Sequence, residues 1–231
     1  TLLELAQDEC LSGDIDIGVV SGEFDAIEGI LNTMGLPYTL FPSLTDPSST
    51  ALMRDPSALA EYEVLMVNCD WGLDWTGHRH EITSNLEDYV YNGGSLYVSD
   101  WSFFVVESTF PDMIDFVGND HDAFESVIGP TGSFHAQILD PVFEAALGKS
   151  ETEIDFDQDG WVVAESVGSG EVLIEAEVTV QTWTEGEKTL NSPLLVRLEH
   201  GEGAVFYTSF HNEAQVSDDV AILLKQIVEN L

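Results

Sequence analysis

The stretch LEDYVYNGGSLYVSDW, residues 86–101, joins the end of an apolar helix face to a strand through two glycines. Gly93 and Gly94 stop the helix, and SLYVSDW (95–101) follows as a strand. The apolar residues before the glycines recur at helical spacing from about His80: Ile82, Leu86, Tyr89 and Val90. The segment therefore predicts a helix that leads directly into a strand.

The same alternation extends toward the N-terminus. VLMVNC (64–69) is a continuous apolar run, which is typical of a strand buried on both faces of a parallel sheet. Before it, DIDIGVVSG (14–22) predicts a strand, followed by a helix with its C-cap at Gly35 and a short strand at YTLFP (38–42). SLTDPSSTALMRDPSALAEYE (43–63) predicts a loop with a short helix.

The C-terminal end repeats the unit. GAVFYTSF (203–210) predicts a strand, and an amphipathic helix follows with Ser217 as its N-cap. Strand, helix and strand in this rhythm indicate right-handed βαβ units. The sequence therefore predicts an α/β fold with a mainly parallel, flavodoxin-like sheet and helices on both faces.

The middle of the chain, about 110–197, departs from this rhythm. PVFEAALG (141–148) is typical of a short helix, whereas WVVAESV (161–167), EVLIEAEVTVQTWT (171–184) and PLLVRLEH (193–200) are typical of antiparallel strands. We expect these strands to form a β-rich elaboration on one edge of the sheet. No linker divides the chain, so residues 1–231 are expected to form a single domain.

The composition combines an apolar core with a very acidic surface. Of 231 residues, 44% are hydrophobic, and 43 acidic side chains against 6 Lys and Arg give a net charge of -37. The apolar content argues against disorder. Such a surface repels nucleic acid and anionic lipid, and no window approaches the ~18 apolar residues of a membrane span. Cations, a carbohydrate or another protein remain as partners, and a homo-oligomer is an alternative.

The charge also indicates the compartment. Self-repulsion on this scale favours a salty or calcium-containing medium, in which counterions screen charges within about 10 Å, so a halophilic, marine or extracellular setting is expected. The chain begins with Thr, which agrees with a processed, secreted or cell-surface protein. Cys10 and Cys69 can pair in an oxidising compartment, or Cys69 is a buried, inert thiol whose pKa is raised by its acidic setting.

Polar side chains follow three of the predicted strands. Because ligands bind at the carboxyl ends of parallel strands, we expect a site at the edge that these ends share. The candidate ligand-binding residues there are Asn68, Asp70, Asp100 and Trp101. Tryptophans could also line a sugar-binding cleft or pack in the core: Trp71, Trp75, Trp101 and Trp161.

Two segments resemble the class I glutamine-amidotransferase-like domains. LEDYVYNGGSLYVSDWSFF (86–104) is similar to the helix, Gly-Gly turn and strand that lead to their nucleophile elbow, and SFHNE (209–213) is similar to their His-x-Glu motif. The combination also resembles the divergent ThuA-like branch. The resemblance covers 14–108 and 195–231, and it implies that His211 is a general base oriented by Glu213.

The chain departs from this family at the nucleophile. Counted from the two glycines, the cysteine position is Ser99, and Trp101 stands where the elbow usually has glycine. This departure argues against glutamine hydrolysis by thiolate chemistry. Ser99, His211 and Glu213 could still form a hydrolase triad if hydroxyl and imidazole lie within roughly 2.6–3.2 Å; otherwise Ser99 bonds its own turn and Glu213 caps the last helix.

Two further motifs could hold metal. His78 and His80 could bind zinc together with a third ligand, or lie on the solvated surface. DFDQDG (155–160) places Asp155, Asp157 and Asp159 like the start of an EF-hand loop. Position 12 is a serine, which excludes an EF-hand and leaves a looser calcium site or a charged turn.

These observations favour a non-catalytic, secreted or cell-surface amidotransferase-like domain for binding or assembly. One alternative is a hydrolase that uses Ser99, His211 and Glu213, or a metal held by histidines. The other is an extracellular structural subunit bridged by calcium.

Overall fold

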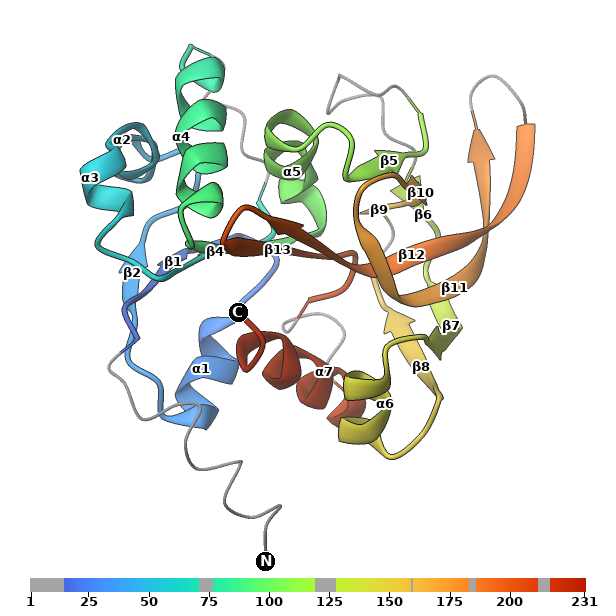
Figure 1. Ribbon diagram of the computed structural model, residues 1–231. Coiled ribbons are helices and arrows are strands. Elements are labelled where there is room, and N and C mark those ends of the chain that lie inside the picture. Colours follow the sequence, from blue (N-terminus) through green and yellow to red (C-terminus); the bar gives the residue numbers. More distant parts are fainter. Residues whose placement is uncertain (1–14, 71–76, 119–127, 159, 183–185, 212–216) are drawn as a thin grey trace, which may run out of the picture.

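A computed structural model describes residues 15–70, 77–118, 128–158, 160–182, 186–211 and 217–231. Its centre is a nine-stranded sheet (Figure 1). In spatial order the strands are β2 (Thr39–Phe41), β1 (Ile17–Val20), β3 (Val64–Val67), β4 (Ser95–Ser99), β13 (Gly203–Thr208), β12 (Gly186–His200), β11 (Glu171–Thr182), β7 (Gly132–Ile138) and β8 (Glu151–Phe156). From β2 to β13 neighbouring strands are parallel, and from β13 to β8 they are antiparallel.

Helices cover both faces of the sheet. In Figure 1 one layer lies above the sheet, and it consists of α2 (Pro47–Arg54), α3 (Pro56–Leu59), α4 (Arg79–Tyr91) and α5 (Phe103–Thr109). The layer below consists of α1 (Glu28–Met34), α6 (Pro141–Leu147) and α7 (Asp218–Val228). The predicted fold class, a mainly parallel flavodoxin-like sheet with an antiparallel elaboration, is confirmed.

The parallel strands are apolar on both sides because both of their faces are covered. In β3, Val64 and Met66 pack into the core below the sheet, and Leu65 and Val67 pack into the core above it. Successive side chains of a strand point to opposite faces, so a strand between two helical layers needs apolar residues at every position. This explains the continuous run that the sequence shows at 64–69.

Helix ends follow the local sequence, with one difference from the prediction. Gly35 ends α1 in the left-handed conformation with φ 73°, and the Ser217 side chain accepts a hydrogen bond from the Val220 amide at the start of α7. Segment 43–63 forms two helices, although one was expected. Asp46 and Asp55 each cap a helix whose first residue is proline, a position where the missing proline N–H costs nothing.

The elaboration extends the sheet beyond β13. β11 and β12 form a long hairpin, and β7 and β8 continue the sheet on its far side (Figure 1). Two small sheets flank it: β5 (Ile114–Phe116) with β10 (Ala164–Val167), and β6 (Ile128–Gly129) with β9 (Trp161–Val162). Phe156 and Trp161 stack with ring centroids 4.1 Å apart, within the same apolar core that α1 and α7 cover.

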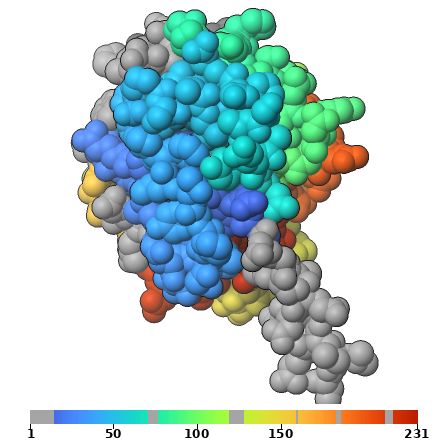
Figure 2. All heavy atoms as spheres, turned by 90° about the vertical axis from the view of Figure 1, so that its left-hand side faces the viewer, coloured from blue at the N-terminus to red at the C-terminus, as the bar shows by residue number. Residues whose placement is uncertain are grey.

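The opposite edge of the sheet is β2. Figure 2 shows this side of the molecule, where α2 and α3 lie above β2 and α1. Leu40 of β2 is 52% exposed. Among the described helices, none is long and apolar enough to cross a membrane.

Candidate functional site

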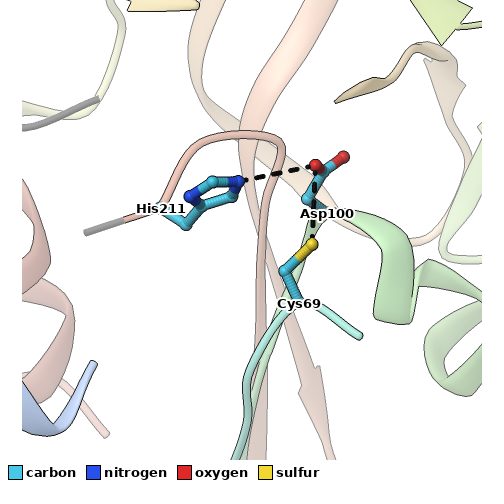
Figure 3. Close-up of side chains that lie close together, drawn as sticks. All are labelled: Cys69, Asp100 and His211. Carbon is cyan, nitrogen blue, oxygen red and sulfur yellow. Dashed lines mark hydrogen bonds and ion pairs between the residues drawn. The ribbon is translucent and has the colours of Figure 1, made fainter. Parts of the chain in front are cut away.

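Three side chains meet at the carboxyl ends of neighbouring parallel strands. Cys69 follows β3, Asp100 follows β4 and His211 follows β13. Their sulfur, carboxylate oxygen and ring nitrogen all lie within 4.8 Å of one another (Figure 3). The residues are 0%, 3% and 3% exposed, respectively. The strand-end edge predicted from the sequence therefore carries a compact polar cluster inside the protein.

Asp100 is the centre of this cluster. Its Oδ2 lies 3.7 Å from Cys69 Sγ and 3.7 Å from His211 Nε2, as the dashed lines in Figure 3 mark. Its Oδ1 accepts a hydrogen bond of 2.7 Å from the Val162 amide of β9. One oxygen thus faces the thiol and the imidazole, while the elaboration holds the other.

The backbone at Asp100 makes a sharp turn. Among the described residues, Asp100 is the non-glycine residue with a positive φ, 40°. It ends β4 and begins a short 3₁₀ turn (Asp100–Ser102) that leads into α5. A strained strand-to-helix turn of this kind defines a nucleophile elbow. The positive φ lies at Asp100, one residue after Ser99, the position to which the count from the two glycines assigns the cysteine.

Ser99 makes a different contact from the one a triad requires. Its Oγ donates a hydrogen bond of 2.6 Å to Asp25 Oδ2, and Ser99 is fully buried. His211 in turn contacts Asp100. Asp25 is 1% exposed and was not identified from the sequence, although it lies in the loop after β1, another parallel strand. Its position after the end of a parallel strand is the feature of the sequence that could have identified Asp25.

Burial and neighbouring charge shift the pKa values of the cluster. Burial, and then the negative charge of Asp100, raise the pKa of the Cys69 thiol well above its ordinary value, as the acidic setting predicted. Burial also raises the pKa of Asp100, against the stabilising contact with His211. For His211 burial alone would lower the pKa, but Asp100 and Asp25 outweigh it and the net pKa is raised.

The other predicted ligand-binding residues bond to neighbouring segments. Asn68 donates to Glu28 Oε2 (2.9 Å) and accepts from the Ile27 amide (3.3 Å), so it positions the start of α1. Asp70 Oδ2 accepts from the Leu44 amide at 3.1 Å. Trp101 donates from Nε1 to the Gly160 carbonyl. These contacts connect the loops around the cluster and give each side chain a structural role.

The described candidate ligands of the predicted histidine and calcium motifs lie on the surface. His78 and His80 are exposed, and His78 Nδ1 lies 3.6 Å from Glu81 Oε2. Asp155 and Asp157 are exposed. Within the described ranges, the group of side chains with metal-binding geometry is Cys69, Asp100 and His211.

Several residues whose roles were predicted from the sequence lie outside the part of the chain that the structure describes. The segments that contain Cys10, Trp71, Trp75, Asp159 and Glu213 lie outside the described residues. Cys69 is a buried free cysteine. The roles predicted for Asp159 and Glu213 therefore stay predictions.

No family model and no curated relative matches this sequence. Solved structures do match the fold. PurLQS from Thermotoga maritima has a TM-score of 0.60 at 13% identity, covering 94% of this chain and 98% of that one. A cytoplasmic protein from Salmonella typhimurium has a TM-score of 0.56 at 12% identity, covering 94% and 97%. The glutaminase domain of Trypanosoma brucei CTPS with bound acivicin has a TM-score of 0.53 at 9% identity, covering 94% and 92%.

These likenesses concern the fold. The chain has a class I glutamine-amidotransferase-like fold, and the likeness covers 94% of the chain. This includes the antiparallel elaboration, which the sequence resemblance did not cover.

Proposed function

We propose that this chain is a non-catalytic amidotransferase-like domain, of the divergent ThuA-like branch, that serves binding or assembly at the cell surface or outside the cell. The observation that carries the proposal is the residue at the elbow. Ser99 stands at the position where the family resemblance implies a cysteine nucleophile, and Asp100 stands at the sharp turn that follows it. A carboxylate there cannot perform thiolate chemistry.

The two nearest candidate nucleophiles are poorly suited to replace that cysteine. The hydroxyl of Ser99 is directed at Asp25, with an oxygen-to-oxygen distance of 2.6 Å. Cys69 is fully buried, and its raised pKa keeps it as a thiol, whereas the reactive form is the thiolate. Both observations weaken the alternative of a hydrolase built on this edge.

The net charge supports the proposed location outside the cell, and the β2 edge of the sheet supports a role in binding or assembly. A net charge of -37 suits a medium in which salt screens repulsion between acidic groups. Among the described residues β2 is the terminal strand of the sheet, and its Leu40 side chain is exposed, so this edge offers a partner a strand to pair with and an apolar side chain. Another protein or a second copy of this chain suits that edge.

The test uses acivicin, the compound bound in the CTPS glutaminase domain, together with a glutamine hydrolysis assay. Wild-type protein is expected to release no ammonia from glutamine and to gain no covalent mass with acivicin. The matched variant Asp100→Cys places a thiol on the elbow beside His211, and we expect it to react with acivicin or with iodoacetamide at that residue.

Hydrolysis of glutamine by the wild-type chain, or an acivicin adduct on Cys69, would overturn the proposal. Peptide mapping of any adduct distinguishes Cys69 from Cys10. A folded Asp100→Cys variant that stays unreactive toward iodoacetamide would show that this turn does not present its side chain as an elbow does.

A further inference from the structure

Three different kinds of metal-ligand atom converge at the strand ends. A thiol sulfur, a carboxylate oxygen and an imidazole nitrogen come from three adjacent strands and lie within 4.8 Å of one another. We propose that Cys69, Asp100 and His211 together bind one divalent transition-metal ion, for which zinc is the best match. This inference goes beyond the binding or assembly role and does not depend on it.

The two distances to the Asp100 carboxylate are close to those of a zinc site. Zinc bonds of about 2.0–2.3 Å at tetrahedral angles place two ligand atoms roughly 3.3–3.5 Å apart. The Asp100 oxygen lies 3.7 Å from the Cys69 sulfur and 3.7 Å from the His211 nitrogen. In Figure 3 the side chains of Cys69 and His211 point toward that same oxygen. These two pairs therefore need to close by only a few tenths of an ångström. The Cys69 sulfur and the His211 nitrogen lie within 4.8 Å of each other, so this third pair has to close by at most about 1.3 Å.

The surroundings hold the ligands in place. The Val162 amide binds Oδ1 of Asp100 and leaves Oδ2 directed at the other two ligands. The backbone around Cys69 is also fixed, because its carbonyl accepts from the Phe24 amide and Gly22 packs against it; a Cβ at Gly22 would lie 2.2 Å from the Cys69 oxygen. Such outer contacts orient metal ligands and tune their affinity.

The donor atoms select the metal. Thiolate and imidazole are preferred ligands of zinc and related transition metals, whereas calcium and magnesium require several oxygen ligands. Two buried carboxylates, Asp25 and Asp100, surround a single imidazole here, so a divalent cation would offset negative charge that is costly to bury. The site differs in this respect from the calcium motif predicted at 155–160.

The experiment titrates the full-length, metal-stripped protein with Zn²⁺ in high salt and a large excess of Mg²⁺ and Ca²⁺, which occupy the acidic surface. We expect one equivalent of zinc to bind per chain, measured by calorimetry and by metal analysis after dialysis. Binding of the metal displaces the proton of the Cys69 thiol, so substitution with Co²⁺ is expected to give the near-ultraviolet sulfur-to-cobalt absorption band of a thiolate ligand. Failure of the wild-type chain to bind one equivalent, or a cobalt complex without that band, would overturn the proposal.

Variants then assign the ligands. Cys69→Ser and His211→Gln are each expected to weaken zinc binding by at least about 100-fold, because removing a ligand costs more than removing an outer contact. The matched controls Cys10→Ser and His135→Gln are expected to leave binding unchanged; His135 is an exposed histidine that contacts Glu151. Circular dichroism confirms that each variant is folded. Loss of binding in the controls, or its retention in a folded Cys69→Ser, would contradict the assignment.

This result is separable from the proposed function. Zinc binding is measured without any substrate, and the acivicin and glutamine assays are performed on the metal-stripped chain. Either proposal can therefore fail while the other stands.

Discussion

The parallel and antiparallel parts of the sheet differ in how their strands meet water. In the parallel part, β1, β3 and β4 are buried at every position. In the antiparallel part, β8 alternates between exposed and buried residues along its whole length. The three parallel strands lie between two helical layers, whereas β8 packs on one side and leaves the other to solvent.

The side chains of the buried cluster and the backbone groups that hold them come from different parts of the molecule. All three side chains of the buried cluster come from the parallel part. The small β6–β9 sheet of the elaboration and the residue before β9, by contrast, contribute backbone groups: the Val162 amide binds Asp100, and the Gly160 carbonyl accepts from Trp101. The elaboration therefore supports the site without supplying one of the three side chains of the cluster, and both parts share the apolar core below the sheet.

The first prediction tests whether the two parts unfold together. Phe206 of β13 and Phe156 of β8 are almost completely buried in the same core. Each Phe→Ala change is expected to reduce the free energy of unfolding by about 3–5 kcal/mol, because it removes apolar contact and leaves a cavity. Leu139→Ala, at a side chain 51% exposed, is the control and should change it by less than about 0.5 kcal/mol.

Denaturant unfolding followed by fluorescence and circular dichroism provides the measurement. A shared core requires one transition, with both probes shifted by either substitution. Two transitions, of which each substitution moves only one, would show that the elaboration is a separate unit and would break the comparison.

The second prediction compares two glycines. A Cβ on Gly203, at the start of β13, would lie 2.1 Å from the Gly94 carbonyl oxygen and 2.4 Å from that of Val90. Gly203→Ala should therefore cost about 3 kcal/mol, since backbone must move. Gly186, at the start of β12, has φ 79° and open space around it, so Gly186→Ala should cost only about 1 kcal/mol of backbone strain. Equal losses in thermal or chemical unfolding would contradict this ranking.

The third and smallest effect concerns pH. The pKa of His211 is raised in the folded state, so its protonated form stabilises the fold below the unfolded pKa of about 6.5, and that contribution is lost as pH rises through the folded pKa. Asp100 also has a raised pKa, which acts in the same direction. With chelator present, the melting-temperature difference between wild type and His211→Gln should shrink from pH 6 to pH 9.

Repeating the comparison in an Asp100→Asn background isolates the pair. Because the hydrogen bond to Asp100 is the largest of the contributions that raise the pKa of His211, the pH-dependent part of the difference should become smaller. A melting-temperature difference that grows with pH in the wild-type background would mean that folding lowers the pKa of His211 instead of raising it.

The sequence predicted the edge of the sheet at which the polar cluster lies. Polar residues after 64–67, 95–99 and 203–208 predicted one shared edge, because carboxyl ends of neighbouring parallel strands meet there. Which side chains would meet at that edge was not predictable. Ser99 and Asp100 are adjacent in the chain. The backbone conformation of the turn at Asp100 directs the Asp100 side chain toward His211, while the Ser99 hydroxyl bonds to Asp25.

The sequence by itself determined the alternation of strands and helices, the acidic surface and the edge on which polar groups collect, since these follow from local periodicity, composition and chain connectivity. Only the tertiary structure decided that Asp25 takes the Ser99 hydroxyl, that Val162 holds Asp100, and that sulfur, oxygen and nitrogen meet in one buried cluster. The first of these contacts joins residues 74 positions apart in the chain, and the second joins residues 62 apart. Such pairings arise only when the fold brings together segments that are distant in the chain.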